Sequence, residues 1–409
     1  MNKIERLLHT LAPKGVGFRK LGEVLEYDQP NKYCVTSKEF DKSYPTPVLT
    51  AGKTFILGYT NEKDNIYQAS KSSPVIIFDD FTTATQWVDF PFKVKSSAMK
   101  ILFSKNPTIN IRFIFFYMQT ISYNIGGEHA RHWISRYSQL EVPIPPLEIQ
   151  QEIIKILDAF TELNAELNAE LNARKKQYQY YQNMLLDFND INQSHKDAKE
   201  RLAQKPYPKR LKTLLQTLAP KGVEFRKLGE VCEIIRGKRV TKKEILDKGK
   251  YPVVSGGIGF MGYLNEYNRE ENTITIAQYG TAGFVNWQNQ KFWANDVCFS
   301  VIPNETLIIN RYLYYVLTNM QNYLYSISNR SAIPYSISSN NIMQITIPIP
   351  PLEIQQEIVK ILDQFSLLTT DLLAGIPAEI KARKKQYEYY REKLLTFKPL
   401  TPNKEVKKC

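Results

Sequence analysis

The most constraining feature of this 409-residue chain is that it contains the same segments twice. The repeated segments are Thr10–Val24 with Thr217–Val231, Pro143–Asp158 with Pro348–Asp363, and the hexapeptide ARKKQY at 173–178 with 382–387. The first two pairs each differ at one position, where Gly17 becomes Glu224 and Ile154 becomes Val359. The copies lie about 205 residues apart, which is the size of a domain with a connector and far longer than a solenoid repeat. The sequence therefore predicts two halves related by a pseudo-twofold axis.

Composition narrows the kind of partner. The formal net charge of +13 favours an anionic partner, with nucleic acid first and a membrane surface second. No apolar run approaches the roughly 18 residues that a membrane span needs, so we expect no membrane segment. The four cysteines are far apart in the sequence and form no C-x-x-C motif, which indicates neither a zinc site nor a disulfide framework. We therefore expect a cytoplasmic protein.

Two segments have the periodicity of long helices. From Leu147, apolar residues recur at spacings of three and four over some forty residues, which is typical of a coiled coil. A second copy runs from Leu352 to about Leu395, where Gly375 and Pro377 interrupt the pattern and Pro377 can restart a helix. Two such stripes most simply bury each other as an antiparallel pair. The alternative is that each stripe packs separately on its own domain.

The segments between the repeats predict short strands with turns and a few helices, because they are rich in Tyr, Phe, Ile, Val and Thr. Faint similarity links them, as in Gly58–Glu62 with Gly262–Glu266 and in Arg112–Phe116 with Arg311–Tyr315. We predict an α+β fold with two pseudo-twofold-related mixed α/β domains, separated by two long antiparallel coiled-coil helices. The predicted segments are a first domain at 1–145, a helix at 146–187, a linker and short helix at 188–216, a second domain at 217–350, a helix at 351–397 and a basic tail at 398–409.

No catalytic constellation is found in the sequence. The glycines at 257–262 fit G-x-G-x-x-G, but no amphipathic helix comes after them, so the dinucleotide context fails. His129 and His132 have no third ligand nearby, and their spacing alone does not make a metal site. We predict no catalytic, cofactor-binding or metal-binding residues and no cofactor for this chain.

Basic, aromatic and small polar residues interleave near the ends of both variable segments, in a pattern that favours DNA binding. Arginine and lysine neutralise phosphates or bind guanine edges, and asparagine and glutamine can read adenine. For each residue the alternative is an ordinary solvated side chain. The candidate DNA-binding residues are Lys53, Thr83, Arg131, His132, Arg136, Arg236, Lys238, Arg239, Gln278, Tyr279, Thr281, Arg330, Tyr335 and Ser336.

The first long helix contains the tetrapeptide ELNA three times in tandem, from Glu162 to Ala173. Glu, Leu and Ala favour helix, and a leucine in every fourth position maintains an apolar seam. One tetrapeptide adds about 6 Å of helix, and DNA advances about 3.4 Å per base pair. Adding or removing a unit should therefore shift two helix-separated modules by one to two base pairs.

Together these features resemble the specificity subunit of type I restriction–modification enzymes. The resemblance covers essentially the whole chain and rests on the block I-P-x-P-P-L-E-x-Q-x-x-I after each variable segment, on A-R-K-K-Q-Y in each helix, and on the tandem tetrapeptide. It implies that two target-recognition domains each read one half of a bipartite site in double-stranded DNA. It also implies that the paired helices fix the gap and dock two modification subunits, which carry S-adenosylmethionine and methylate adenine. Restriction subunits, with motor and nuclease activities, would complete the enzyme.

The expected function is thus DNA-sequence recognition by a non-catalytic subunit. One rival is a fused methyltransferase–specificity protein, against which the missing catalytic motifs argue. The other rival is a coiled-coil protein-interaction scaffold without DNA contact.

Overall fold

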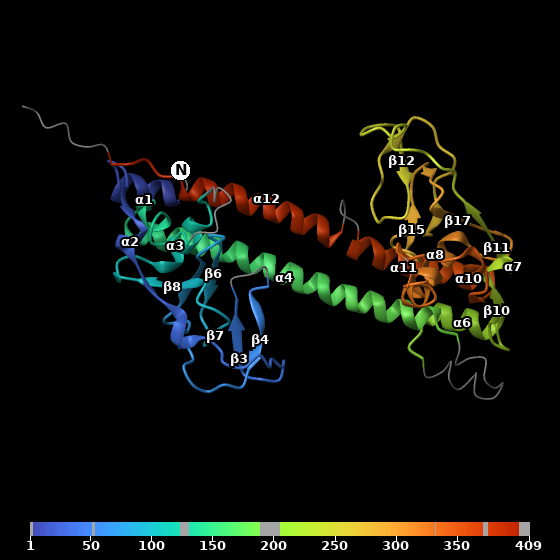
Figure 1. The fold of residues 1–409 in the computed structure, drawn as a ribbon, viewed down its shortest axis with the longest axis horizontal. Helices are drawn as coiled ribbons and strands as arrows, with labels where there is room; N and C mark the ends of the chain where they lie inside the picture. Colours follow the sequence, from blue (N-terminus) through green and yellow to red (C-terminus); the bar gives the residue numbers. More distant parts are fainter. Residues whose placement is uncertain are drawn as a thin grey trace, which may run out of the picture. The chain divides into compact units, whose positions relative to one another are not determined.

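The computed structural model describes residues 3–50, 54–122, 131–188, 205–331, 333–370 and 375–400. The chain forms two compact units, which we describe one at a time (Figure 1). Unit 1 comprises Met1–Leu167 together with Ile380–Cys409, and unit 2 comprises Asn168–Glu379. Unit 1 is therefore assembled from both ends of the sequence, whereas unit 2 is continuous.

In each unit the two longest repeated blocks pair with each other. Strand β1 (Gly17–Lys20) lies antiparallel to β9 (Glu141–Ile144), and β10 (Glu224–Lys227) lies antiparallel to β18 (Thr346–Ile349). Short helices come directly after the first strands, namely α2 (Leu21–Val24) and α7 (Leu228–Val231). The repeated sequence thus forms the base on which each variable segment is built.

The variable segments fold into the same two sheets in both units. Unit 1 has a four-stranded sheet in the order β2-β8-β5-β6 and a three-stranded sheet β4-β3-β7, and unit 2 has β11-β17-β14-β15 and β13-β12-β16. The unit 1 strands are β2 (Leu25–Asp28), β3 (Thr46–Leu49), β4 (Ile56–Thr60), β5 (Val75–Asp79), β6 (Thr85–Val88), β7 (Lys93–Val94) and β8 (Met99–Ser104). The unit 2 strands are β11 (Cys232–Arg236), β12 (Tyr251–Val254), β13 (Tyr263–Leu264), β14 (Thr273–Ala277), β15 (Val285–Gln288), β16 (Trp293–Ala294) and β17 (Cys298–Pro303).

Helices complete each core. The remaining unit 1 elements are α1 (Lys3–Leu11), η1 (Pro30–Tyr33), α3 (Ile111–Met118), η2 (Tyr137–Gln139), the first part of α4 (Leu147–Leu186) and most of α12 (Ile376–Leu395). Those of unit 2 are α6 (Lys209–Leu218), α8 (Asn310–Asn319), α9 (Gln321–Ser326), α10 (Ser339–Met343) and α11 (Leu352–Thr370). The central strands β5 and β14 are buried along their whole length. In β5, Ile76 and Phe78 pack in the cluster that contains α3, whereas Val75 and Ile77 pack on the other face with residues of the smaller sheet.

The long helices pack both on their domains and on each other. The sequence left two alternatives open, an antiparallel helix pair and separate packing of each helix on its own domain, and both kinds of packing occur. The first apolar positions of α4, including Ile149, Ile153 and Leu157, are fully buried in the unit 1 core. Further along α4, Phe160 stacks on Tyr390 of α12 at 5.6 Å in unit 1, and Tyr181 stacks on Phe365 of α11 at 5.0 Å in unit 2. Within each unit the partner helix runs antiparallel to α4 (Figure 1). The predicted restart of the second helix is confirmed, since α12 begins at Ile376.

An arginine links helix α3 to α4 in unit 1, and an arginine links helix α8 to α11 in unit 2. Arg112 of α3 donates to Asp158 Oδ1 of α4 through Nε at 2.9 Å and through Nη2 at 2.7 Å, and its guanidinium lies 4.4 Å from the ring centre of Trp87. In unit 2 the same three-way contact joins Arg311, Asp363 and Trp287. Partial burial would lower the pKa of Arg311, but the contacts with Asp363 and Tyr315 together outweigh this effect, so the pKa is raised. The faint similarity around Arg112 and Arg311 thus marks equivalent positions.

A buried glutamine explains part of the repeated P-P-L-E-I-Q block. The side chain of Gln355 accepts a hydrogen bond from Ile309 N at 2.7 Å and donates to the carbonyls of Pro350 at 2.7 Å and Leu307 at 3.0 Å. In unit 1, Gln150 accepts from Asn110 N and donates to Pro145 O. Both glutamines are almost completely buried, with 0% and 1% of their surface exposed. Each therefore holds a loop of its domain against the start of its long helix.

We expect Gln355→Ala to lower the free energy of unfolding of unit 2 by about 2–4 kcal/mol. The substitution leaves a buried backbone N–H and two carbonyls without their side-chain partner, and an unsatisfied buried group costs about 1–3 kcal/mol. The matched control is Gln356→Ala, one residue further along, where the side chain is exposed. Urea denaturation of the two variants measures the difference. Equal midpoints would contradict the assigned role of Gln355.

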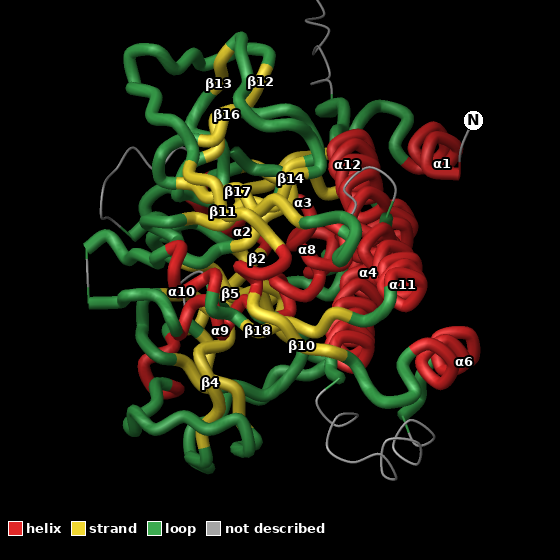
Figure 2. Tube along the Cα trace, turned by 90° about the vertical axis from the view of Figure 1, so that its right-hand side faces the viewer, coloured by secondary structure: helices red, strands yellow, loops and turns green. Residues whose placement is uncertain are grey.

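Helices α1 and α6 lie on the side of the long helices that faces away from the strands (Figure 2). Lys3 of α1 forms an ion pair with Glu152 of α4 at 2.5 Å, and Arg210 of α6 forms one with Glu357 of α11 at 3.1 Å. In unit 1 the last described residues return beside α1, where Val16 N donates to Lys398 O and Leu400 N donates to Val16 O. Of the predicted linker and short helix at 188–216, residues 189–204 lie outside the described residues. Among the helices that the structure describes, none is long and apolar enough to cross a bilayer.

Candidate nucleic-acid interface

In unit 2 the strand order brings two predicted DNA-binding segments to one edge of the sheet. β17 lies between β11 and β14, and its first residues pair with the last residues of both, as Phe299 with Arg236 and Cys298 with Ala277. The basic loop Arg236–Arg239 and the turn Gln278–Thr281 therefore leave the sheet at the same end. The two segments are far apart in the sequence. They become neighbours because, in an antiparallel pair, the end of one strand lies beside the start of the other.

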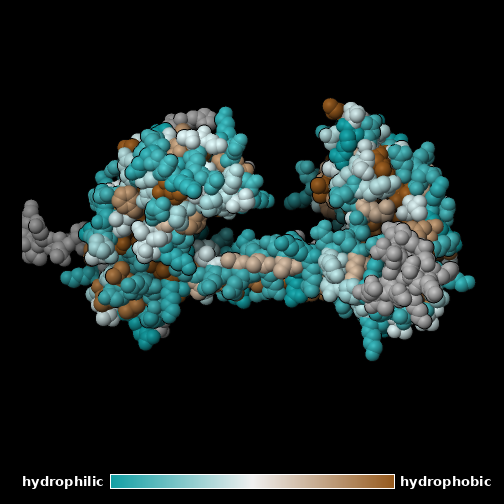
Figure 3. Space-filling view, turned by 90° about the horizontal axis from the view of Figure 1, so that it is seen from below, coloured by the Kyte–Doolittle hydropathy of each residue, from teal (hydrophilic) through white to brown (hydrophobic). Residues whose placement is uncertain are grey.

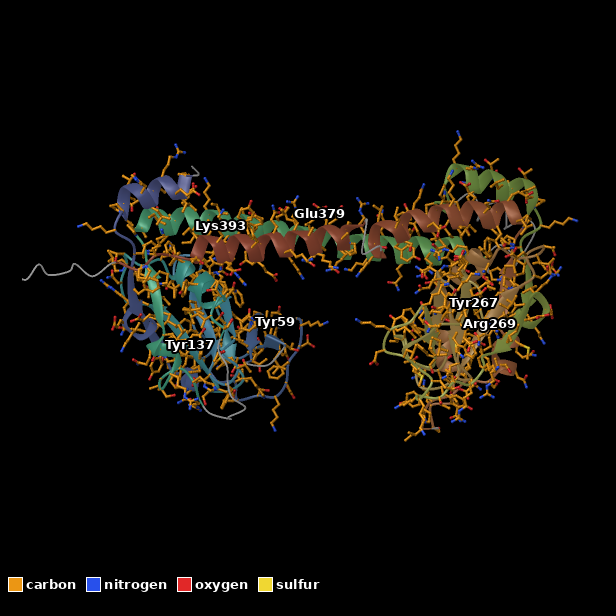
Figure 4. All side chains as sticks on the ribbon, turned by 90° about the horizontal axis from the view of Figure 1, so that it is seen from above. Tyr59, Tyr137, Tyr267, Arg269, Glu379 and Lys393 are labelled. Atoms are coloured by element: carbon orange, nitrogen blue, oxygen red, sulfur yellow. The ribbon has the colours of Figure 1, made fainter. Side chains whose placement is uncertain are left out.

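The turn before β17 holds both segments. Arg236 Nε donates to Asp296 O at 2.6 Å, Lys238 N donates to Ala294 O at 2.9 Å, and Gln278 N donates to Val297 O at 2.9 Å. Arg269, labelled in Figure 4, supports the same edge by donating to Ser300 Oγ at 3.0 Å and to Arg236 O at 3.3 Å. The basic loop is thus fixed along its backbone, while Lys238 and Arg239 remain exposed.

The third predicted segment joins the same edge. Tyr279 and Ser336 form a β-bridge, and Gly280 N donates to Tyr335 O at 3.1 Å. The guanidinium of Arg330 lies 4.9 Å from the ring centre of Tyr335. We name this surface the unit 2 edge, and its residues are Arg236, Lys238, Arg239, Gln278, Tyr279, Thr281, Arg330, Tyr335 and Ser336.

Not every side chain of the unit 2 edge is available to a ligand. Thr281 donates its hydroxyl to Gly256 O at 2.7 Å, so this group serves the turn itself. Gln278 Oε1 is buried without a hydrogen-bond partner, although the residue as a whole is partly exposed. The exposed members are Arg236, Lys238, Arg239, Arg330 and Tyr335. Positive charge and aromatic surface therefore dominate this edge.

The corresponding edge of unit 1 has the same backbone plan with different side chains. The turn after β5 includes Thr83, which has a positive φ of 58° and donates its N–H to Asp79 O at 2.9 Å. Arg131 and Arg136 are both exposed. They lie near this turn because His132, which stands between them in the sequence, donates its backbone N–H to Asp80 O at 2.9 Å. We name Thr83, Arg131 and Arg136 the unit 1 edge. Lys53, also predicted here, lies outside the described residues.

His132 must be removed from the predicted interface. None of its surface is exposed, so its side chain does not reach a ligand in this conformation. His132 is buried because it takes the same position in unit 1 as Ile337 takes in unit 2. The backbone N–H of His132 donates to Asp80 O, and the backbone N–H of Ile337 donates to Gln278 O. His132 therefore occupies a core position that is filled by an apolar residue in the other copy.

Sequence reasoning missed a buried ion pair beneath the unit 1 edge. Lys100 Nζ lies 3.6 Å from Asp80 Oδ2, and the two side chains are 3% and 1% exposed. Lys100 also donates to Gln29, which in turn donates to Ser97 O at 3.1 Å, and Asp80 Oδ1 accepts from Trp133 N at 2.8 Å. Such a pair is costly to break from one side. Gln29 and Asp80 thus occupy the places of Arg236 and Gln278, which makes the two edges chemically different.

A second shared motif, G-Y-x-N-E, supports the smaller sheet. In unit 1, Glu62 accepts hydrogen bonds from Thr36 N at 2.9 Å and Ser37 N at 2.8 Å, and pairs with Lys93 Nζ at 3.0 Å. Partial burial opposes ionisation, but these donors outweigh it and lower the pKa of Glu62 to about 2. The carboxylate therefore stays charged across physiological pH and ties three segments together.

Across the described residues, no group of three or more His, Cys, Asp or Glu side chains is placed to hold a metal ion. A basic and aromatic surface on a duplicated mixed α/β domain is the footprint expected of a nucleic-acid-binding protein. The fold matches the crystal structure of a type I restriction–modification S subunit from M. genitalium with a TM-score of 0.63, at 17% identity over 93% of this chain and 96% of that one.

Sequence comparisons make the assignment specific. The family described as "Type I restriction modification DNA specificity domain" matches residues 13–174 and 220–382. The chain is 38% identical to the EcoR124I/EcoR124II specificity subunit of Escherichia coli, over 98% of both chains. It is 30% identical to a putative type I specificity subunit of Haemophilus influenzae, over 84% of this chain and 85% of the relative. The chain belongs to the family of type I restriction–modification specificity subunits, which select the DNA and are not the catalytic part of the system.

Proposed function

We propose that each unit reads one half of a bipartite, asymmetric site in double-stranded DNA. The observation that carries this proposal is the repeated plan of the two edges, which keeps the backbone and changes the side chains. A shared fold with different edges suits two readers of different sequences. The recognition domains would be residues 1–145 and 217–350.

The proposal assigns two tasks to the edge residues. Arg236, Lys238, Arg239 and Arg330 would bind phosphates or guanine edges, and Tyr279, Tyr335 and Ser336 would contact bases or sugars. In unit 1 the same tasks would fall to Thr83, Arg131 and Arg136, with Lys53 as a further phosphate contact. Affinity would come largely from phosphates and would fall with salt, while a few polar contacts would give specificity.

The long helices would set the gap between the half-sites and dock two modification subunits, to which restriction subunits would be added. The repeated hexapeptide ARKKQY supports this view, because Arg174 and Lys175 are exposed and packing does not explain their repetition. A cytoplasmic location follows from these partners. No cofactor is assigned to this chain.

Methylation mapping tests the function. A host that carries this chain and its modification subunit should show adenine methylation at one bipartite motif. Replacing residues 217–350 with the second domain of another specificity subunit should change one half of that motif only. Methylation without a bipartite motif, or a swap that changes both halves, would overturn the proposal.

A charge substitution tests the phosphate contacts. We expect Arg239→Ala in the assembled complex to weaken binding at all sequences and to reduce the slope of log affinity against log salt by about 1. Its matched control is Lys243→Ala, an exposed residue beyond the basic loop. Fluorescence anisotropy at several salt concentrations measures both. An unchanged slope for Arg239→Ala would exclude this side chain from the interface.

A further inference from the structure

Each unit exposes a pair of apolar side chains at equivalent positions, which lie in strand β4 in unit 1 and just before strand β13 in unit 2. The pairs are Ile56–Leu57 in unit 1 and Phe260–Met261 in unit 2, and both stand directly before the shared G-Y-x-N-E motif. Their exposed fractions are 36% and 42% in unit 1, and 47% and 40% in unit 2. We call them the apolar pairs. Single exposed apolar residues are ordinary, but a pair repeated at equivalent positions of two diverged domains is not.

The backbone presents these side chains to solvent. In unit 1 the ladder between β3 and β4 shifts register, so that Leu49 pairs with Ile56 whereas Val48 pairs with Gly58. Leu57 is the extra residue of this β-bulge, and bulges re-aim side chains beside functional surfaces. In unit 2, Met261 N donates to Val253 O, and Val253 N donates to Gly262 O. Phe260 and Met261 therefore lie just before the paired residues of β13, and both side chains are exposed.

Positive charge lies beside each apolar pair. In unit 2, Asn295 Oδ1 accepts from Val240 N at 3.1 Å, and Asn295 Nδ2 lies 3.7 Å from Met261 Sδ. Asn295 thus contacts both Met261 and the backbone of Val240, and the exposed residue Arg239 directly precedes Val240 in the chain. In unit 1, Lys95 Nζ lies 5.3 Å from the ring centre of Phe40, and Phe40 packs over Gly58 next to Leu57.

Apolar side chains flanked by cations match the two surfaces of DNA. The cationic side chains would form ion pairs with the phosphates, and the apolar side chains would contact the base pairs. Proteins insert Phe, Leu, Ile and Met between base steps, or set them against thymine methyl groups. Figure 3 shows apolar groups as isolated patches on a mostly hydrophilic surface. Other apolar partners, such as a second protein, would not require the flanking Lys95 and Arg239.

We propose that the apolar pairs contact the bases of the DNA, Ile56–Leu57 in one half-site and Phe260–Met261 in the other. This inference rests on the proposed function and adds a kind of contact that the basic edges do not provide. Each pair would bind the apolar face of a base step or the methyl group of a thymine. Specificity would then include a contribution that does not depend on salt.

The test uses the complex of this chain with its modification subunit and a duplex that carries the mapped motif. We expect Phe260→Ala to weaken binding about tenfold, in line with base–aromatic contacts. Met261→Ala should also weaken binding, because it removes apolar surface from the same contact. The salt slope should stay unchanged, whereas Arg239→Ala should reduce it. Ile302→Ala is the matched control, because Ile302 is 37% exposed in the same unit but lies near the opposite end of β17.

Two modified duplexes identify the base contact. In one, deoxyuridine replaces each thymine in turn; in the other, 2-aminopurine reports unstacking by its fluorescence. We expect Phe260→Ala to abolish the effect of one thymine methyl group or the fluorescence rise at one step. If Phe260→Ala and Met261→Ala bind both probes as Ile302→Ala does, the apolar pairs do not contact bases. If the unaltered complex binds no duplex, the proposed function fails as well.

Discussion

Deleting one ELNA tetrapeptide should change the gap between the two half-sites and leave both half-sites the same. Removing residues 166–169 shortens α4 by about 6 Å and rotates the rest of the helix by about 40°, which corresponds to one or two base pairs. The stacked contacts Phe160–Tyr390 in unit 1 and Tyr181–Phe365 in unit 2 lie on either side of the deletion. Each unit therefore keeps its own packing.

Methylation mapping of a host that carries the deletion gives the new motif. The control is Glu166→Ala, which alters an exposed residue of the same helix without changing its length. The control should retain the original gap. A deletion that methylates the original motif at the original level would show that α4 does not set the gap.

The second large effect is expected from Gly237→Ala, in the basic loop of the unit 2 edge. A Cβ at this position would lie 2.1 Å from Asn295 O and 2.4 Å from Ala294 O, both of which are backbone atoms. The loop must therefore move, and it takes Arg236, Lys238 and Arg239 with it. Since these side chains would bind phosphates, we expect the complex to bind its site about tenfold or more weakly.

Gly259→Ala is the control for this prediction, because a Cβ there would meet nothing within 4 Å. Co-purification with the modification subunit should be normal for both variants, which separates a displaced loop from a failure to fold. Anisotropy with the mapped duplex then gives the affinities. Wild-type affinity of Gly237→Ala would mean that the position of the basic loop is unimportant for binding.

Local patterns in the sequence predicted much of this fold. The 3–4 spacing of Ile149, Ile153 and Leu157 indicated the long helix, and repetition indicated two equivalent domains. The pairing of β1 with β9 joins residues more than a hundred positions apart, which no local pattern indicates. The return of Lys398 to Val16 is likewise a long-range contact.

The candidate interface was easier to predict in unit 2 than in unit 1. The three basic and polar segments of unit 2 meet because the fold brings their loops to one end of the sheet. In unit 1, His132 looked like a surface residue beside Arg131, and only the fold shows that it takes the buried position that Ile337 takes in unit 2. The buried pair of Asp80 and Lys100 was also hidden, because its members come from different parts of the sheet and acquire a common environment only on folding.

The division of the chain into a continuous and a split unit bears on how the protein is made. Domains generally fold as they leave the ribosome, beginning with the N-terminal one. Here unit 1 needs Leu395, which is 4% exposed in its core, and Phe397, whose ring lies 6.2 Å from that of Phe113. These residues are translated after all of unit 2. The half of the molecule whose synthesis starts first is therefore the last to be completed.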